Sequence, residues 1–176
     1  PVRGVVVYAS IVWAFRDQND GSAAMFKATG AGWVQQTFGS TLDFTLGTLE
    51  FDEGDLITGG TSGATATVQR VVMQSGAWGT DAAGFLVLSN ITGTFSAAEI
   101  ITSASGHATN TAAQVAIALS PGGVYEFTTH NFYGATKSAR LYFVNGVGTA
   151  FEWDGLVLAP IRSGTNTGSI FGFLQQ

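Results

Sequence analysis

The sequence contains no cysteine and only three prolines, and 11 % of its residues are charged, against about 25 % in an average soluble domain. The absence of cysteine excludes a disulfide scaffold, a cysteine-ligated zinc site and a thiol nucleophile. With seven Lys and Arg residues and a net charge of −5, the chain lacks the cationic surface that binds nucleic-acid phosphates. No apolar run approaches the ~18 residues of a membrane helix, so we expect no membrane segment.

Glycine and aromatic side chains are abundant instead. The chain has 24 glycines among 176 residues, and its aromatic share is 12 %. Its apolar stretches are short, rich in β-branched and aromatic residues, and bounded by Gly, Asn, Asp, Ser and Thr. This pattern is typical of strands joined by turns, and helical periodicity is nearly absent. The sequence therefore predicts an all-β fold.

The first part of the chain indicates an antiparallel meander. Ile11, Trp13 and Phe15 fall on one side of a period-two ribbon, and the run Asn19-Asp20-Gly21 that follows supplies a tight turn. With about four strands, this meander fills residues 1–48. Its expected strands are 5–8, 11–17, 23–28 and 33–37.

The C-terminal third repeats this organisation. Asn145-Gly146 and Asp154-Gly155 are turn signals between alternating apolar runs. The expected strands are 124–128, 140–144, 150–154 and 156–161. Four-stranded antiparallel sheets that occur twice suggest blades of a β-propeller.

The segment between the meanders carries an internal duplication. Phe51 and Phe95 are 44 residues apart (95 − 51 = 44), and each begins the pattern Phe, two residues, Gly or Ala, an acid, an apolar residue, Ile and Thr. A Ser-Gly turn and an Ala/Thr-rich strand follow in both copies. Two copies favour a small hairpin or barrel-like module over a solenoid, which needs about three or more repeats.

Charge separates the middle segment from its flanks. Positive and negative residues balance in 1–48 and in 119–176, so the net charge of −5 falls within 49–118. The simplest interpretation is a neutral body interrupted by an acidic module. We therefore expect a blade-like β body from 1–48 and 119–164, an inserted acidic module at 49–118, and a flexible C-terminal segment at 165–176.

The sequence contains no recognisable catalytic motif. The nearest match to a serine-hydrolase elbow, Gly-Gly-Thr-Ser-Gly at 59–63, has Thr where the nucleophile would stand, and no Lys follows it as a phosphate loop requires. His107 and His130 fall in no metal-ligand spacing, and we expect the first in an exposed hairpin turn. Paired carboxylates for glycoside cleavage require a separation of about 5 to 9 Å, which the sequence leaves open. We predict no enzyme activity, no catalytic residue and no cofactor.

One turn resembles the start of a calcium loop. Asp17, Asn19 and Gly21 have suitable types, but Ala28 stands where the closing glutamate belongs. A hairpin turn is the better interpretation, and we predict no metal site, with binding at Asp17 and Asn19 left open. A second acidic group has the residue types to bind a cation jointly, but solvated side chains that protect a strand edge are the better interpretation. Its members are Glu50, Asp52, Glu53 and Asp55.

Trp78 is the best candidate for an exposed contact residue. It lies in a polar, glycine-containing stretch at 77–83, whereas most other aromatic residues occupy alternating strand positions. Trp and Tyr often form sugar platforms or subunit interfaces. A glycan- or receptor-binding β module that uses Trp78 is therefore the alternative function. Asn90-Ile-Thr92 matches a glycosylation acceptor, which we interpret as a chance match.

Several segments resemble the tail nozzle (tail tubular) proteins of short-tailed bacteriophages. Residues 12–21, 25–28 and 32–33 look like one blade of such a protein. The stretch 59–66 is similar to small β modules inserted in many phage virion proteins. The segments that look like the following blade are 122–127, 131–134, 141–147 and 151–155.

The resemblance implies a virion structural protein located in a phage tail. Proteins of this family are built as propellers and assemble in rings below the portal, around the channel through which DNA leaves. The expected partners are other copies of the chain and neighbouring tail or portal proteins, with genomic DNA passing and weakly bound; a host surface glycan belongs to the alternative. Two blades cannot close a propeller, which takes at least about four. The chain is therefore expected to be a piece of a larger nozzle-like protein, or a reduced relative.

Overall fold

The computed structural model describes residues 1–132 and 139–162, and within these ranges every regular element is a β-strand. The sheets are built from antiparallel strand pairs. The predicted all-β class, with meander sheets and a barrel-like module, is thus confirmed. No helix in the described ranges is long and apolar enough to cross a membrane. The segment 165–176, predicted to be flexible, lies outside the described residues.

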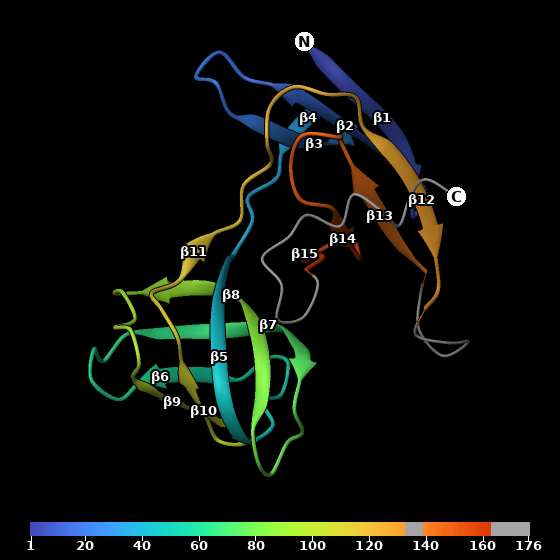
Figure 1. The fold of residues 1–176 in the computed structure, drawn as a ribbon. Helices are drawn as coiled ribbons and strands as arrows, with labels where there is room; N and C mark the ends of the chain where they lie inside the picture. Colours follow the sequence, from blue (N-terminus) through green and yellow to red (C-terminus); the bar gives the residue numbers. More distant parts are fainter. Residues whose placement is uncertain (133–138, 163–176) are drawn as a thin grey trace. The chain divides into compact units, whose positions relative to one another are not determined.

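The described chain divides into two compact units (Figure 1). One unit consists of Pro1–Phe38 and Ala118–Arg162, and the other of Gly39–Ile117. The sequence placed the start of the inserted module at residue 49, ten residues too late. The reason is β5 (Ser40–Leu49), which pairs with strands of the second unit and with none of the first meander.

The first four strands form a meander in chain order, which we call the N-terminal sheet. The turn between its second and third strands is the one predicted at 19–21, where Gly21 has φ +81°. The preceding turn is less usual, because Ala9 and Ser10 occupy positive φ values of 52° and 61° without being glycine. The strands are β1 (Val2–Tyr8), β2 (Ile11–Asp17), β3 (Ala23–Thr29) and β4 (Gly32–Gln35).

The last four strands form a second meander, which we call the C-terminal sheet. Phe127, Phe143 and Phe151 are register partners and therefore share one face. Asn145 closes the loop after the second strand, because its amide donates to the carbonyl of Ser120 at 2.8 Å. The strands are β12 (Glu126–His130), β13 (Arg140–Val144), β14 (Phe151–Trp153) and β15 (Leu158–Pro160).

The two meanders pack against each other through aromatic side chains. The Trp13 ring meets the Trp153 ring edge-on at 5.4 Å between centroids, and the Phe15 ring lies 4.8 Å from that of Phe143. Gly4 allows the close approach, since a Cβ there would stand 2.7 Å from the Cβ of Tyr125. Aromatic pairs of this kind contribute about 0.5–1.5 kcal/mol each beyond the burial of their area.

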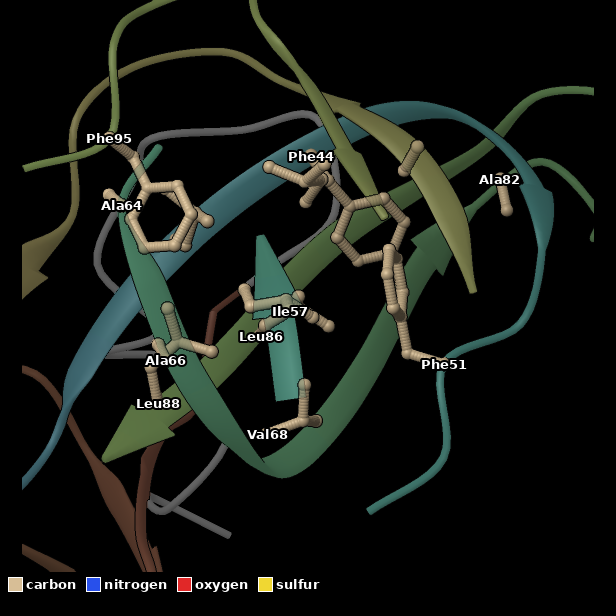
Figure 2. Packing of buried hydrophobic residues seen from close by; sticks show 13 residues of the cluster. Phe44, Phe51, Ile57, Ala64, Ala66, Val68, Ala82, Leu86, Leu88 and Phe95 are labelled. Carbon is tan, nitrogen blue, oxygen red and sulfur yellow. The ribbon is translucent and has the colours of Figure 1, made fainter. Parts of the chain in front are cut away.

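The second unit is a closed six-stranded barrel. Its strands follow the order β10-β9-β6-β7-β8-β5, and β10 also pairs with β5, which closes the sheet. Figure 2 shows the apolar residues that fill the barrel, with Phe95 beside Ala64. The strands besides β5 are β6 (Leu56–Gly59), β7 (Thr65–Ser75), β8 (Ala82–Thr92), β9 (Ile100–Thr102) and β10 (His107–Asn110).

The barrel begins and ends at the same place. The short strand β11 (Val115–Ala116) pairs with the first residues of β5. Beyond it, the Ile117 N–H donates to the carbonyl oxygen of Gly39 at 3.0 Å. The entry and exit of the unit are therefore hydrogen-bonded neighbours.

The duplication covers the whole barrel, not only the hairpins around Phe51 and Phe95. Leu42 is the register partner of Leu86, and Thr58 is the register partner of Thr102. Each of these pairs joins equivalent residues of the two copies at the same spacing as the two phenylalanines. Equivalent residues that face each other in antiparallel ladders define a local two-fold axis, which relates β5–β6–β7 to β8–β9–β10.

Backbone conformation repeats with the same spacing. Leu46 and Asn90 have φ values of 52° and 49°, and Gly54 and Ala98 have φ values of 102° and 57°. Positive φ is uncommon outside glycine and asparagine, because the Cβ of other residues crowds the backbone. At each pair of equivalent positions, one copy therefore has a residue type that tolerates positive φ (Asn90 or Gly54), and the other has one that does not (Leu46 or Ala98).

Candidate contact surfaces and an acid–turn interlock

The N-terminal sheet is apolar on both faces. Trp13, Phe15 and Met25 point to the C-terminal sheet and are buried. On the opposite face, which we call the outer valine face, Val7 and Val12 are register partners and are 66 % and 36 % exposed. The register adds apolar and polar members to this face: Val5, Ala14, Phe26, Ala28 and Trp33, and also Arg16 and Gln35.

The outer face of the C-terminal sheet is polar in contrast. Arg140 forms an ion pair with Glu152, and the Tyr142 hydroxyl donates to the same carboxylate at 3.0 Å. Glu126 and Thr128 lie exposed on this face. The two sheets therefore differ in the surface that each turns away from the other.

Glu99 is a buried carboxylate that holds the hairpin turn of the other repeat. Its Oε2 accepts hydrogen bonds from the N–H groups of Thr61 and Ser62, both at 2.8 Å. Its Oε1 accepts the Ser62 hydroxyl at 2.7 Å and the Ser96 N–H at 2.6 Å. Gly59 leaves the space for this, since a Cβ there would stand 2.6 Å from Oε1. Glu99 is only 3 % exposed.

Asp55, the equivalent acid of the first repeat, makes the reciprocal contact. Its Oδ2 accepts the Ser103 hydroxyl at 2.6 Å and also the Ser105 hydroxyl, both from the turn of the second repeat. The prediction that Asp55 is a solvated edge acid is therefore wrong, because the turn opposite supplies hydroxyl donors. Each repeat caps the turn of the other, and we call the pair Asp55 and Glu99 with these turns the acid–turn interlock.

The interlock lowers the pKa of both carboxyls. Hydrogen bonds from Ser103 and Ser105 hold the pKa of Asp55 below its ordinary value. Burial alone would raise the pKa of Glu99, but its hydrogen bonds from Ser62, Thr61 and Ser96 together outweigh burial and lower it. Both groups are ionised hydrogen-bond acceptors at neutral pH, a state suited to holding turns.

Trp78 packs onto the end of the barrel core. Its ring stacks on that of Phe44 at 5.4 Å between centroids and 16° between planes, and it meets Phe51 edge-on at 6.3 Å. A Cβ on Gly47 would approach the Trp78 ring to 2.5 Å, so the ring can pack here only because residue 47 has no side chain. The side chain is partly buried, not freely exposed as the sequence led us to expect. A contact role for Trp78 stays a prediction.

The acids singled out in the first turn are occupied by local partners. Asp17 pairs with Arg3 at 2.6 Å and accepts the Gly122 N–H at 3.1 Å, and the contacts with Arg3 and then Gly122 lower its pKa. Asp20 accepts the Ser22 hydroxyl at 2.6 Å. Within 1–132 and 139–162, no three His, Cys, Asp or Glu side chains gather to hold a metal ion.

The other acids and histidines considered in the sequence have individual local environments. Glu53 forms an ion pair with Arg70 at 2.8 Å, while Asp52 is exposed. His107 lies on β10 and not in the turn, with its Nδ1 3.1 Å from the Thr48 hydroxyl. His130 ends β12, and its ring stacks on that of Phe132 at 4.1 Å.

Two motifs considered in the sequence have structural roles. Ser62, within the stretch that partly matches a hydrolase elbow, donates its hydroxyl to Glu99 and so caps a turn. Asn90, within the glycosylation-like triplet, is an exposed residue of β8 whose amide is 3.5 Å from the Thr67 hydroxyl. Neither residue stands beside a histidine or a second acid that would activate it among the contacts observed.

No family model, curated protein or solved structure matches the chain. Sequence reasoning missed two features, the outer valine face and the reciprocal use of Asp55 and Glu99. The unbroken apolar run from Val5 to Tyr8 signalled the first, since a sheet covered on one side alternates between apolar and polar residues. The repeated acid in each copy signalled the second.

Proposed function

We propose that this chain is a virion structural protein, part of a tail nozzle that assembles with other tail subunits around the DNA exit channel of a short-tailed phage. One observation carries the proposal: two four-stranded antiparallel meanders stack through aromatic faces, with a self-contained barrel between them in the sequence. Successive propeller blades interrupted by an insertion would have this arrangement. The resemblance of the blade-like segments to nozzle proteins is what connects this arrangement with a role in a phage tail.

The chemistry of the described residues is consistent with a mechanical role. The carboxylates that are buried or half-buried hold turns or ion pairs, as Glu99, Asp55 and Glu152 do. The chain has few cations to grip phosphate and a net charge of −5. A channel wall with this charge lets DNA pass without binding it tightly, because tight binding requires cations that displace counterions.

Labelling of particles tests the proposal directly. Antibodies raised against the purified chain are added to phage particles of the source, and bound gold is located by electron microscopy. Label at the tail, next to the portal, supports a nozzle protein. Label on the capsid shell contradicts the proposal. The absence of label from both intact and opened particles also contradicts it.

The alternative, a glycan-binding module that uses Trp78, has less support. Sugar platforms present an open aromatic face, whereas the Trp78 ring is stacked on Phe44 and packed over Gly47. Glycan-array binding by the purified chain that Trp78→Ala abolishes would favour this alternative. In that experiment Trp33→Ala, at an exposed tryptophan of the other unit, serves as the control.

A further inference from the structure

The N-terminal sheet has the composition of a sheet covered on both sides. A sheet with one solvated face alternates between apolar and polar residues, whereas β1 and β2 present apolar residues in both directions. The C-terminal sheet covers one side through Trp153 and Phe143. The other side, the outer valine face, leaves Val7 66 % and Trp33 56 % exposed. Apolar patches of this kind mark sites where another surface docks.

We propose that the outer valine face binds the same face of a second copy of this chain, so that the protein forms a two-fold symmetric dimer with the two N-terminal sheets stacked. The inference goes beyond the proposed function and does not depend on a phage tail. Stacked sheets lie about 10 Å apart, with side chains of both faces interdigitating. Val7 and Val12, register partners next to the β1–β2 turn, would lie at one end of the contact, with Ala14 and Phe26 of the two central strands nearer its middle.

Charge selects this pairing over the other sheet-to-sheet contact. If the outer valine face met the outer face of the C-terminal sheet, it would bury Glu126 and the charges of Arg140 and Glu152 against valines. Burying charges against apolar groups is costly unless new partners are supplied. On the valine face itself the charged side chain is Arg16, which lies near the end of β2 with its guanidinium 5.6 Å from the Phe26 ring centre.

The size of the face predicts a weak dimer. Four strands about 4.8 Å apart, up to about seven residues long at about 3.3 Å per residue, cover roughly 450 Å². Two copies therefore bury roughly 900 Å² together, close to the ~1,000 Å² at which specific interfaces begin. We expect dissociation in the micromolar range, so that the dimer is seen by raising the protein concentration.

Sedimentation equilibrium of the full chain over a wide concentration range tests the inference. The expected mass rises from 18.3 kDa to twice that value. Val7→Glu should weaken dimerisation at least about a hundredfold, because it buries a carboxylate without a partner. Thr128→Glu, which places the same charge on the outer face of the C-terminal sheet, is the matched control and should dimerise like the parent chain.

A second variant keeps the test decisive if Val7→Glu does not fold. The chain has no cysteine, so Val7→Cys and Thr128→Cys each provide a single thiol. A short bis-maleimide should link two copies through position 7 and not through position 128. A monomer at all concentrations, or equal linkage at both positions, overturns the inference. A larger ring that Val7→Glu leaves intact also overturns it, while leaving the nozzle proposal standing.

Discussion

Removing the Glu99 carboxylate should destabilise the barrel by about 3 kcal/mol. Glu99→Ala deletes the acceptor of four hydrogen bonds, three of them from the backbone N–H groups of Thr61, Ser62 and Ser96. A donor left without a partner costs about 1–3 kcal/mol when buried. We take the lower end for each, because these three residues are exposed and water reaches part of the turn.

Amide hydrogen exchange of the barrel strands is the appropriate measurement. The two units can unfold separately, so a single fluorescence or circular dichroism curve mixes their transitions. Exchange at the amides of Leu86 and Leu88, in the core of β8, reports the free energy of opening the barrel itself. Protection there should fall by roughly a hundredfold or more in Glu99→Ala.

Two comparisons decide whether the hydrogen bonds are responsible. Glu50→Ala removes an exposed carboxylate from the same acidic unit and should change protection by less than about 0.5 kcal/mol. Glu99→Gln keeps the shape of the side chain but turns one acceptor into a donor. Its loss of protection should therefore lie between those of Glu50→Ala and Glu99→Ala. If Glu99→Ala costs no more than Glu50→Ala, the interlock does not hold the barrel together.

Three further outcomes are expected. Because the pKa of both interlock carboxyls is lowered in the folded state, the unfolded chain binds more protons than the folded chain as pH falls below about 4. The barrel should therefore keep its full stability above that pH and lose stability in acid. Hydrogen exchange from pH 6 to 3 would measure this loss, and Glu99→Gln should make it smaller. Leu46→Asn should stabilise the barrel by about 1 kcal/mol as measured by the same hydrogen exchange, since Leu46 is 56 % exposed at a positive φ and its equivalent is Asn90, whereas Asn90→Leu should destabilise it. Gly106→Ala should cost about 1–3 kcal/mol, because its Cβ would overlap the ring of Phe51, while Gly63→Ala meets open space and tests only the strain of φ +68°.

Much of the strand content could be predicted from local signals. The alternation of Ile11, Trp13 and Phe15 and the Asn-Asp-Gly turn after them correspond to β2 and its hairpin. Period-two patterns depend only on neighbouring residues, and turns on the few residue types that tolerate positive φ. These features are therefore visible without knowledge of the partner strand.

The pairing of strands far apart in sequence could not be predicted in this way. The alternation of Leu42 and Phe44 indicates a strand, but nothing in it says that the strand closes a barrel with β10 instead of extending the first meander. The same limit applies to Asp55, which has the composition of a surface acid. Its environment depends on two serines about fifty residues away, supplied by the other repeat.

Because Gly39 and Ile117 are hydrogen-bonded neighbours, the barrel is a cassette, a unit that can be inserted or removed as a whole. A domain whose two ends are hydrogen-bonded neighbours can be grafted into a host loop, or cut out of one, without stretching the host backbone. Joining Phe38 to Ala118 through a short glycine linker should leave the sheet pairings of the remaining body possible, since each pairs within itself. The excised cassette, in turn, carries its own core and its own closure, and so could be transplanted whole to another scaffold.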